Sequence, residues 1–219
     1  MHDLRDWIKK VEEMGELLCL ENADWNLEIG CIEEVVSQKA GKRPALLFDK
    51  IKDYPAGCRI LTNVLGSLPR LCLAAGFPTD YKPVEFIHRW RKISKELKPL
   101  PPRYVATGPV MENVITGNDI DLLKFPVPLV HHLDGGRYIS TGAISITQDP
   151  DEGWVNLGTY RGQLIDKSSI GWYISPGKHG IIQRERYFEK GQPCPAVITL
   201  GQDPTLFLAA SMEIPRGLS

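Results

Sequence analysis

A short proline-rich run near the middle of the chain limits what the whole sequence can fold into. Residues 98–102 read Lys-Pro-Leu-Pro-Pro, and proline lacks the backbone N–H that the interior of a helix or strand needs. Each proline also disfavours helical geometry in the residue before it. Because no regular element can continue through this run, we place a domain boundary here. The first domain is expected over residues 1–102 and the second over residues 103–219.

The first domain mixes helical and strand patterns, which indicates an α/β domain. Asp3 is placed to cap a first helix and Gly15 to end it. A second helix is expected over residues 27–40, followed by strands at 45–48 and 59–64 and by helices over 67–75 and 83–97. Apolar spacings of three and four predict the buried faces of the 27–40 and 83–97 helices, which carry Ile32, Val35 and Val36, and Val84, Ile87, Trp90, Arg91 and Leu97, respectively.

The second domain has the pattern of a β-rich unit. A strand is expected over residues 143–148, a turn over 149–153 and a second strand over 154–164, which together predict a β-hairpin. A further strand is expected over 170–175, a helix over 179–190 and an extended segment over 196–200. The whole chain is therefore of the α+β class, and its second half is predicted to be a barrel or sandwich with inserted helices.

The charge and hydropathy of the chain exclude several classes of function. The 26 Lys and Arg residues are balanced by 27 Asp and Glu residues, so the net charge of −1 provides no basic field for nucleic acid or an anionic membrane. No apolar run approaches the roughly 18 residues of a membrane-spanning helix, and the first ten residues are unlike a signal peptide. We therefore expect a cytoplasmic protein with no transmembrane segment and no nucleic-acid partner.

The five cysteines are odd in number and never form a C-x-x-C pair. This argues against a disulfide framework and against a zinc-thiolate site. We expect most of them to be buried as small apolar side chains.

Two polar segments of the second domain could carry chemistry. The segment 134–142 contains paired glycines, which allow the backbone to approach a ligand closely, although a simple hairpin entry would need the same residues. In the segment 156–161, Asn156 and Thr159 offer hydrogen-bonding groups, Arg161 is a permanent cation, and the amides around Gly158 could bind phosphate. His179 follows in the segment 175–180. Each also has an ordinary explanation, as a strand-end cap, a surface cation or the start of a helix.

These segments, in this order, resemble the UbiD family of decarboxylases. Residues 3–8, 15–17 and 45–48 are similar to the opening helix and first strand of that family. The more specific likeness lies in residues 118–128 and 134–139, and in the segments Trp-Val-Asn-Leu-Gly-Thr-Tyr-Arg at 154–161 and Ser-Pro-Gly-Lys-His at 175–179. The likeness extends along essentially the whole chain.

The resemblance implies a fold and a cofactor. It implies that the first domain packs beside a split β-barrel of the flavin-reductase type, which holds prenylated FMN, with manganese or magnesium at the flavin phosphate and potassium nearby. By position, Asn156 and His179 would bind the divalent ion. The cofactor would also contact Gly158, Thr159, Tyr160, Lys178, Arg161 and Thr141, and the last two would line the reaction pocket. Potassium would be held near Ala209, Ser211 and Met212, where Glu213 departs from the proline common in the family.

The implied reaction is the reversible, non-oxidative decarboxylation of an aromatic or α,β-unsaturated carboxylic acid. The flavin would take up the electron pair left by carbon dioxide, and Arg161 would balance charge near the carboxylate as the catalytic residue of this chain. A flavin prenyltransferase would supply the cofactor, and the full-length protein would be a homo-oligomer. In the family a third metal ligand, a Glu, follows an Ile-Pro-x-Gly segment, here residues 214–217. We therefore expect a chain truncated at its C-terminus and inactive by itself.

Two other functions remain open from the sequence. The barrel could hold ordinary FMN as a carrier or a small flavin reductase, which would need no divalent ion at the phosphate. The chain could also be a non-catalytic subunit of a heteromeric decarboxylase. The identity of the substrate is not indicated by the residues present.

Overall fold

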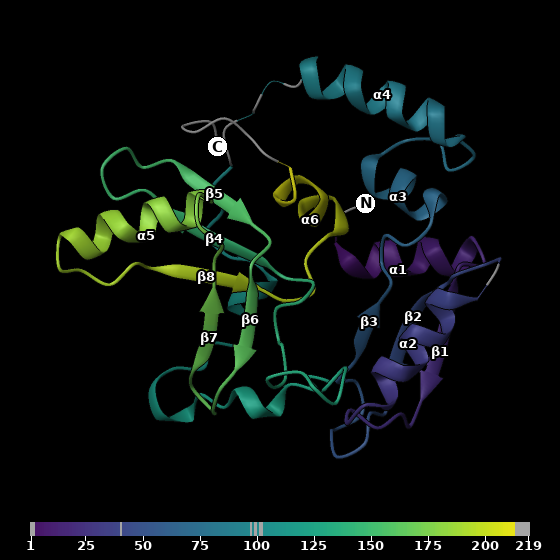
Figure 1. Cartoon of the computed structure of the whole chain (residues 1–219), viewed down its shortest axis with the longest axis horizontal. Coiled ribbons are helices and arrows are strands. Elements are labelled where there is room, and N and C mark those ends of the chain that lie inside the picture. Colours follow the sequence, from purple (N-terminus) through teal and green to yellow (C-terminus); the bar gives the residue numbers. More distant parts are fainter. Residues whose placement is uncertain (1–2, 40, 97, 99, 101–102, 213–219) are drawn as a thin grey trace.

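The computed structural model describes residues 3–39, 41–96, 98, 100 and 103–212. The first part is built around a sheet in the order β1–β2–β3 (Figure 1), in which β1 (Leu17–Glu21) is parallel and β3 (Ile60–Thr62) antiparallel to β2 (Ala45–Asp49). Since successive side chains of a strand point to opposite faces, β2 supplies two cores. Ala45 packs with Trp7 of α1 (Leu4–Glu13) on one side, and Leu46 packs with Ile29 of α2 (Glu28–Gln38) on the other.

The structure confirms the two expected helices that flank this sheet and revises one of them. Asp3 caps α1, because its Oδ1 accepts a hydrogen bond from the Asp6 N–H at 3.0 Å. Helix α2 ends at Gln38, and the prediction that Val35 is buried was wrong, since more than half of this side chain is exposed. The buried positions of α2 are Ile29 and Gly30, where a Cβ would lie 2.2 Å from the Val130 carbonyl oxygen.

Helices α3 (Leu68–Ala75) and α4 (Pro83–Glu96) follow, as expected. The predicted apolar face of α4 was wrong at Val84 and Ile87, which are more than half exposed. Arg91 is exposed as well, whereas Trp90 turns inward as expected and is joined by Phe86, with ring centroids 6.3 and 5.5 Å from that of Phe77. One aromatic cluster therefore decides which side of α4 is covered. Leu97 and three residues of the proline-rich run (99, 101 and 102) lie outside the described residues.

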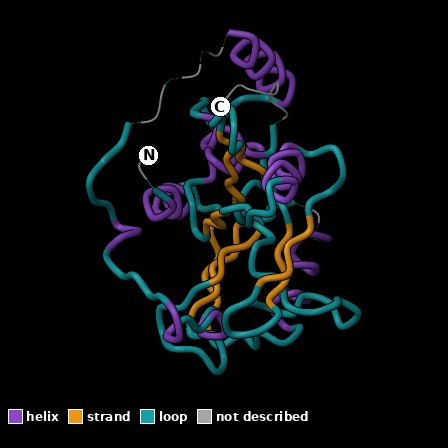
Figure 2. The backbone as a smooth tube through the Cα atoms, turned by 90° about the vertical axis from the view of Figure 1, so that its left-hand side faces the viewer, coloured by secondary structure: helices purple, strands orange, loops and turns teal. Residues whose placement is uncertain are grey.

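Residues 103–143 connect the two parts as a long loop that passes down one side of the molecule (Figure 2) and contains three 3-10 turns, Pro109–Met111, Gly117–Asp119 and Leu122–Lys124. Near its end this loop returns to the first part. The Leu27 N–H donates to the Leu129 carbonyl at 2.9 Å, and the Leu129 N–H donates to the Trp25 carbonyl at 3.0 Å. The end of the loop is thereby anchored to the segment between β1 and α2.

The second part contains two small sheets. Strands β5 (Val155–Gly158), β4 (Ile144–Gln148) and β8 (Ala196–Thr199) form an antiparallel sheet in that order, and β6 (Arg161–Leu164) pairs with β7 (Ile170–Tyr173). Helix α5 (His179–Glu189) packs on β4 and β5, and α6 (Pro204–Ala210) packs on these strands and on α3. The described residues thus form a mixed α+β fold with open sheets, and they close no barrel.

Two expectations for this part were incomplete. The single strand expected over residues 154–164 is two strands, because the chain leaves one sheet at Gly158 and joins the other at Arg161. Strand β1 and helix α6 were not expected. In α6, Asp203 caps the helix by accepting the Thr205 N–H at 2.7 Å, and the Thr205 hydroxyl donates to the Ala74 carbonyl of α3 at 2.9 Å.

The cysteines are free thiols, and the expectation that most are buried was wrong. Only Cys72 is buried, whereas Cys19 and Cys31 are exposed. Cys19 lies on β1 at the edge of its sheet, and Cys31 lies on the outer side of α2. Within the described residues, no helix combines the length and the apolar character needed to cross a membrane.

Candidate functional site

Asn156 lies at the centre of a buried polar cluster in the second part. It stands opposite Thr147 in the β4–β5 ladder, and its side chain is 7% exposed. Its Nδ2 donates to the Thr147 hydroxyl and to the Tyr160 hydroxyl, each at 3.3 Å. Among the described residues nothing donates to its Oδ1. The amide therefore keeps one oxygen lone-pair acceptor for a ligand.

The start of α5 meets this cluster. The Tyr160 hydroxyl accepts a hydrogen bond from the Gly180 N–H at 3.3 Å, next to His179. The half-buried His179 ring stands edge-on to the Trp154 ring, with centroids 5.2 Å apart. Trp154 and Asn156 are two residues apart on one strand segment and so face the same side. The structure thus brings the two candidate metal ligands, Asn156 and His179, to one place.

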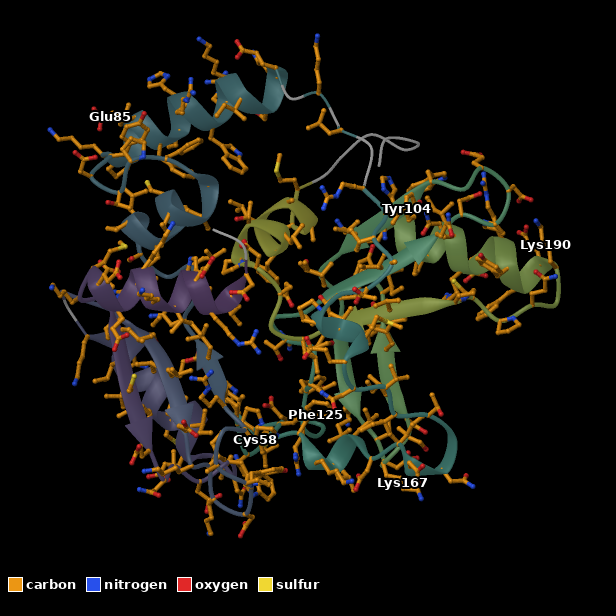
Figure 3. All side chains as sticks on the ribbon, turned by 180° about the vertical axis from the view of Figure 1, so that it is seen from behind. Cys58, Glu85, Tyr104, Phe125, Lys167 and Lys190 are labelled. Atoms are coloured by element: carbon orange, nitrogen blue, oxygen red, sulfur yellow. The ribbon has the colours of Figure 1, made fainter. Side chains whose placement is uncertain are left out.

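Helix α5 is held against the β4–β5 hairpin by the turn between the strands. The buried Asp149 carboxylate accepts the N–H groups of Asp151 and Glu152 at 3.0 and 2.8 Å and pairs with Arg186 of α5 at 2.6 Å. Burial opposes ionisation of Asp149, but these amides and the guanidinium outweigh it and hold the pKa of the carboxyl below its ordinary value. At the end of the helix, Lys190, which is labelled in Figure 3, pairs with Asp151. The hairpin and the helix are therefore one unit.

The glycines of the site are explained by close approach of the Tyr160 ring. A Cβ at Gly158 would lie 2.3 Å from the Tyr160 ring, and one at Gly180 would lie 2.8 Å from it. Packing against Tyr160 is therefore one reason for a glycine at position 158. The phosphate contact expected from the sequence would be a second reason. Thr159 and Lys178 are exposed, and Lys178 is the residue that precedes α5.

Arg161 and Thr141 meet at a residue that the sequence did not single out as functional, Tyr138. The guanidinium carbon of the exposed Arg161 lies 5.4 Å from the centroid of the Tyr138 ring, within the range of a cation–π contact. The exposed Thr141 directs its hydroxyl to the Tyr138 carbonyl at 3.4 Å. Tyr138 also forms an antiparallel bridge with Gln163 of β6. The two candidate pocket residues are thus joined through Tyr138.

The candidate potassium residues lie at the end of α6. The Ala209 carbonyl accepts the Met212 N–H at 3.0 Å, and the Ser211 hydroxyl donates to the Leu208 carbonyl at 2.7 Å. Their backbone oxygens are at the carbonyl end of a helix, which favours cations. Glu213 and the Ile-Pro-Arg-Gly segment lie outside the described residues.

A cavity lies elsewhere, between the first part and β6. It has a volume of about 440 Å³ and is lined by Trp25, Gly136 and Arg137, among others. Arg137 stacks on Trp25 at 4.4 Å and donates to the Tyr54 hydroxyl at 2.6 Å. The paired glycines of segment 134–142 line this cavity, where a Cβ at Gly136 would lie 2.4 Å from Gln163 Nε2, and the cavity does not mark the polar cluster.

The donor set fits a hard divalent ion. Within the described ranges there is no group of three His, Cys, Asp or Glu side chains placed to hold a metal. Asn156 and His179 offer instead an amide oxygen without a partner and an imidazole, a mixed oxygen and nitrogen set without thiolate that suits manganese or magnesium. The residues present therefore fit the metal that the resemblance implies, as two of its ligands.

Comparison with known proteins identifies the family of the chain. The N-terminal domain of 3-octaprenyl-4-hydroxybenzoate carboxy-lyase, UbiD, matches residues 8–90, and the Rift-related domain of that family matches residues 103–219. The pyrrole-2-carboxylic acid decarboxylase of Pseudomonas aeruginosa is 34% identical over 225 residues, which cover 99% of this chain and 45% of that protein. The phenolic acid decarboxylase of Streptomyces sp. strain D7 is 32% identical, covering 97% and 45%.

Solved structures agree with these sequence matches. Vanillic acid decarboxylase of Sedimentibacter hydroxybenzoicus in its closed form has a TM-score of 0.90 at 28% identity, over 98% of this chain and 46% of that one. The UbiD-class enzyme HmfF of Pelotomaculum thermopropionicum in complex with FMN has a TM-score of 0.85 at 28% identity, over 100% and 46%. The chain spans about half the length of these relatives, and it belongs to the UbiD family of carboxy-lyases.

Proposed function

We propose that this chain forms the cofactor-binding and metal-binding half of a decarboxylase that uses prenylated FMN. The observation that supports this most directly is that the Tyr160 hydroxyl joins Asn156 to the Gly180 N–H, next to His179, in a chain that matches UbiD relatives along 97–99% of its length. An evolved dimeric form of HmfF, of known structure, is a complex with prFMN and is similar to this chain with a TM-score of 0.86.

Asn156 through its amide oxygen and His179 through an imidazole nitrogen would hold manganese or magnesium at the flavin phosphate. The backbone from Gly158 to Tyr160 would contact the cofactor, together with Lys178. Potassium would bind at the carbonyl groups near Ala209, Ser211 and Met212. When bound, prenylated FMN supplies the electron sink for decarboxylation.

Arg161 is the catalytic residue of the proposal. It has no carboxylate partner among the described residues, so its charge is available to a substrate carboxylate. The Tyr138 ring limits the directions the guanidinium can take, and Thr141 would line the same pocket. The substrate class is an aromatic or α,β-unsaturated carboxylic acid, in keeping with the relatives named for pyrrole-2-carboxylic and phenolic acids.

We further propose that the parts missing from this site come from outside residues 1–219. These parts are the third metal ligand, the acid that delivers a proton, and further strands of the split barrel. The barrel would begin at residue 103 of this chain. Residues 1–219 alone should then release no carbon dioxide. A flavin prenyltransferase would provide the cofactor, and the complete protein would be a homo-oligomer.

The test uses the protein expressed from its complete coding sequence together with a flavin prenyltransferase. The purified protein should carry flavin and manganese and should release carbon dioxide from an aromatic acid. His179→Ala should lose most of the bound manganese and flavin, whereas His88→Ala, which removes an exposed imidazole of α4, should lose neither. Retention of both by His179→Ala would contradict the site. Oxidation of a nicotinamide cofactor without need of a divalent ion would indicate a flavin reductase instead.

A further inference from the structure

We infer that a buried chain of hydrogen bonds from Gln183 through Thr147 fixes the amide of Asn156 so that its oxygen, and not its nitrogen, faces the divalent ion. The inference rests on the proposed function, which assigns that ion to Asn156 and His179. Gln183 and Thr147 are positioning residues: they act on the ion through Asn156.

The chain of hydrogen bonds is sealed from solvent. Gln183 is 0% exposed and Thr147 is 2% exposed. Gln183 Nε2 donates to the Trp154 carbonyl at 3.1 Å, the Thr147 hydroxyl donates to Gln183 Oε1, and Asn156 Nδ2 donates to the Thr147 hydroxyl at 3.3 Å. Leaving any of these groups without a partner would cost about 1–3 kcal/mol. The arrangement of donors and acceptors is therefore under strong constraint.

The Trp154 carbonyl, at one end of this series of hydrogen bonds, sets the direction of all of them. The two ends of a side-chain amide are nearly equal in size, so only hydrogen bonding decides which way the amide points. The Trp154 carbonyl can only accept, so it must face the NH₂ group of Gln183, and Gln183 Oε1 must then face Thr147. Thr147 has a single hydroxyl hydrogen and gives it to this oxygen. What Thr147 offers to Asn156 is a lone pair, which only the Asn156 NH₂ group can use.

The contacts at the other end are compatible with this orientation. With the Asn156 amide turned this way, its second hydrogen is donated to the Tyr160 hydroxyl, which also accepts the Gly180 N–H. Both N–H groups of Asn156 are then occupied, and Oδ1 is the atom left over. Because Gly180 follows His179, the same tyrosine hydroxyl ties the position of one proposed ligand to the orientation of the other.

The inference is tested by measuring Mn²⁺ binding to the protein expressed from its complete coding sequence and loaded with FMN, by electron paramagnetic resonance of the free ion. Thr147→Val keeps the shape of the side chain and removes the hydroxyl, and Tyr160→Phe removes the other partner of the Asn156 amide together with the acceptor of the Gly180 N–H. Each should raise the dissociation constant for Mn²⁺ about tenfold or more, the usual effect of losing a group that orients a metal ligand. Thr147→Ser restores the hydroxyl and should bind within about threefold of the wild type.

A matched control exists in the same sheet. The hydroxyl of Thr199 in β8 lies 3.2 Å from Gln202 Oε1, and Gln202 Nε2 donates to the Gly142 carbonyl at 2.6 Å. This is the same series of threonine, glutamine and carbonyl groups, but it does not contact Asn156. Thr199→Val should therefore destabilise the fold comparably and leave Mn²⁺ affinity within about threefold. Thermal melting without metal monitors folding, and Tyr160→Phe decides the matter if Thr147→Val does not fold.

The outcomes separate the inference from the function on which it rests. Weak binding by Thr147→Val and Tyr160→Phe, with recovery in Thr147→Ser, supports the inference. If Asn156→Ala abolishes binding but Thr147→Val and Tyr160→Phe bind as Thr199→Val does, the inference is wrong and the metal site stands. If the wild type binds no Mn²⁺ that depends on Asn156, the proposed function fails, and the inference fails with it.

Discussion

Replacement of Arg70 by methionine should be among the most damaging single changes in the first part of the chain. Arg70 is fully buried, and its guanidinium pairs with Glu16 Oε2 at 2.5 Å. Its Nε donates to the Val64 carbonyl at 3.0 Å, and one terminal nitrogen donates to the carbonyls of Arg43 and Asn63 at 2.7 and 3.1 Å. The side chain thus joins the start of α3 to the residues just before β1 and β2 and just after β3.

The cost follows from what the substitution leaves behind. Methionine fills the space of the arginine stem but donates nothing, so one carboxylate loses its cation and three carbonyls lose a donor. Breaking a buried ion pair from one side typically costs about 3–5 kcal/mol. The Glu16 side chain is 18% exposed and still accepts from the Ser67 hydroxyl, so water and one hydrogen bond relieve part of the loss. We expect about 3 kcal/mol, a large fraction of the roughly 5–15 kcal/mol that holds a domain together.

Urea denaturation of Arg70→Met and the wild type measures this difference in the free energy of unfolding. Arg5→Met is the control, because Arg5 is 81% exposed and lies 3.6 Å from Asp3, and such a surface pair contributes about 1 kcal/mol at most. The double variant Glu16→Leu with Arg70→Met should recover stability relative to Arg70→Met alone, since it removes the stranded carboxylate. A loss below about 1 kcal/mol in Arg70→Met would refute this account of the buried pair.

Three further changes test the site and its support. The pKa of Asp149 is lowered in the folded protein because its amide partners and Arg186 outweigh burial, so its carboxylate stabilises the fold above the unfolded pKa of about 4 and loses this effect as the pH falls through the folded value. Asp149→Asn should therefore lower the melting temperature at pH 7 and have less effect near pH 3. Gly158→Ala should displace the Tyr160 ring and weaken flavin and Mn²⁺ retention. Arg161→Lys should reduce carbon dioxide release about 100-fold with flavin content unchanged, because an ammonium group lacks the planar fork.

Each of these has a matched comparison. Gly108→Ala adds a methyl group where nothing lies within 4 Å, and Arg103→Lys changes an exposed cation away from the polar cluster. Equal loss in the control and the test variant would contradict the assignment, as would an Asp149→Asn effect that is the same at pH 7 and pH 3.

The elements that the sequence predicts well are those whose signals are local. The Asp3 cap of α1 was predictable because it joins a side chain to an amide only three residues later, so a short segment of sequence contains both partners. The inward face of α4 could not be obtained this way, because Phe77, outside the helix, selects Phe86 over Val84. Strand β1 was missed for a related reason: only pairing with β2 gives this partly exposed edge segment its structure.

The candidate site divides along the same line. Asn156 and His179 were identified by resemblance to a family motif, and the structure brings them together. Thr147 and Gln183 were missed, because a threonine in a strand and a glutamine in a helix have no special pattern. Their role depends on the register that sets Thr147 opposite Asn156 and on the packing of α5 over that pair. Gln183 lies one helical turn after His179, but its burial was not predictable from the mixed composition of that helix face.

The break between β5 and β6 has a geometric consequence for the proposed chemistry. In one continuous strand, Asn156 and Arg161 would be five residues apart and would point to opposite faces. A ligand of the metal and a cation for the substrate could not then serve the same cofactor from one side. The corner at Thr159 and Tyr160 removes this restriction, since Arg161 begins a second sheet with its own orientation. The same corner places the Tyr160 hydroxyl on Asn156 and Gly180, which explains why the strand expected from sequence alone had to be broken at this point.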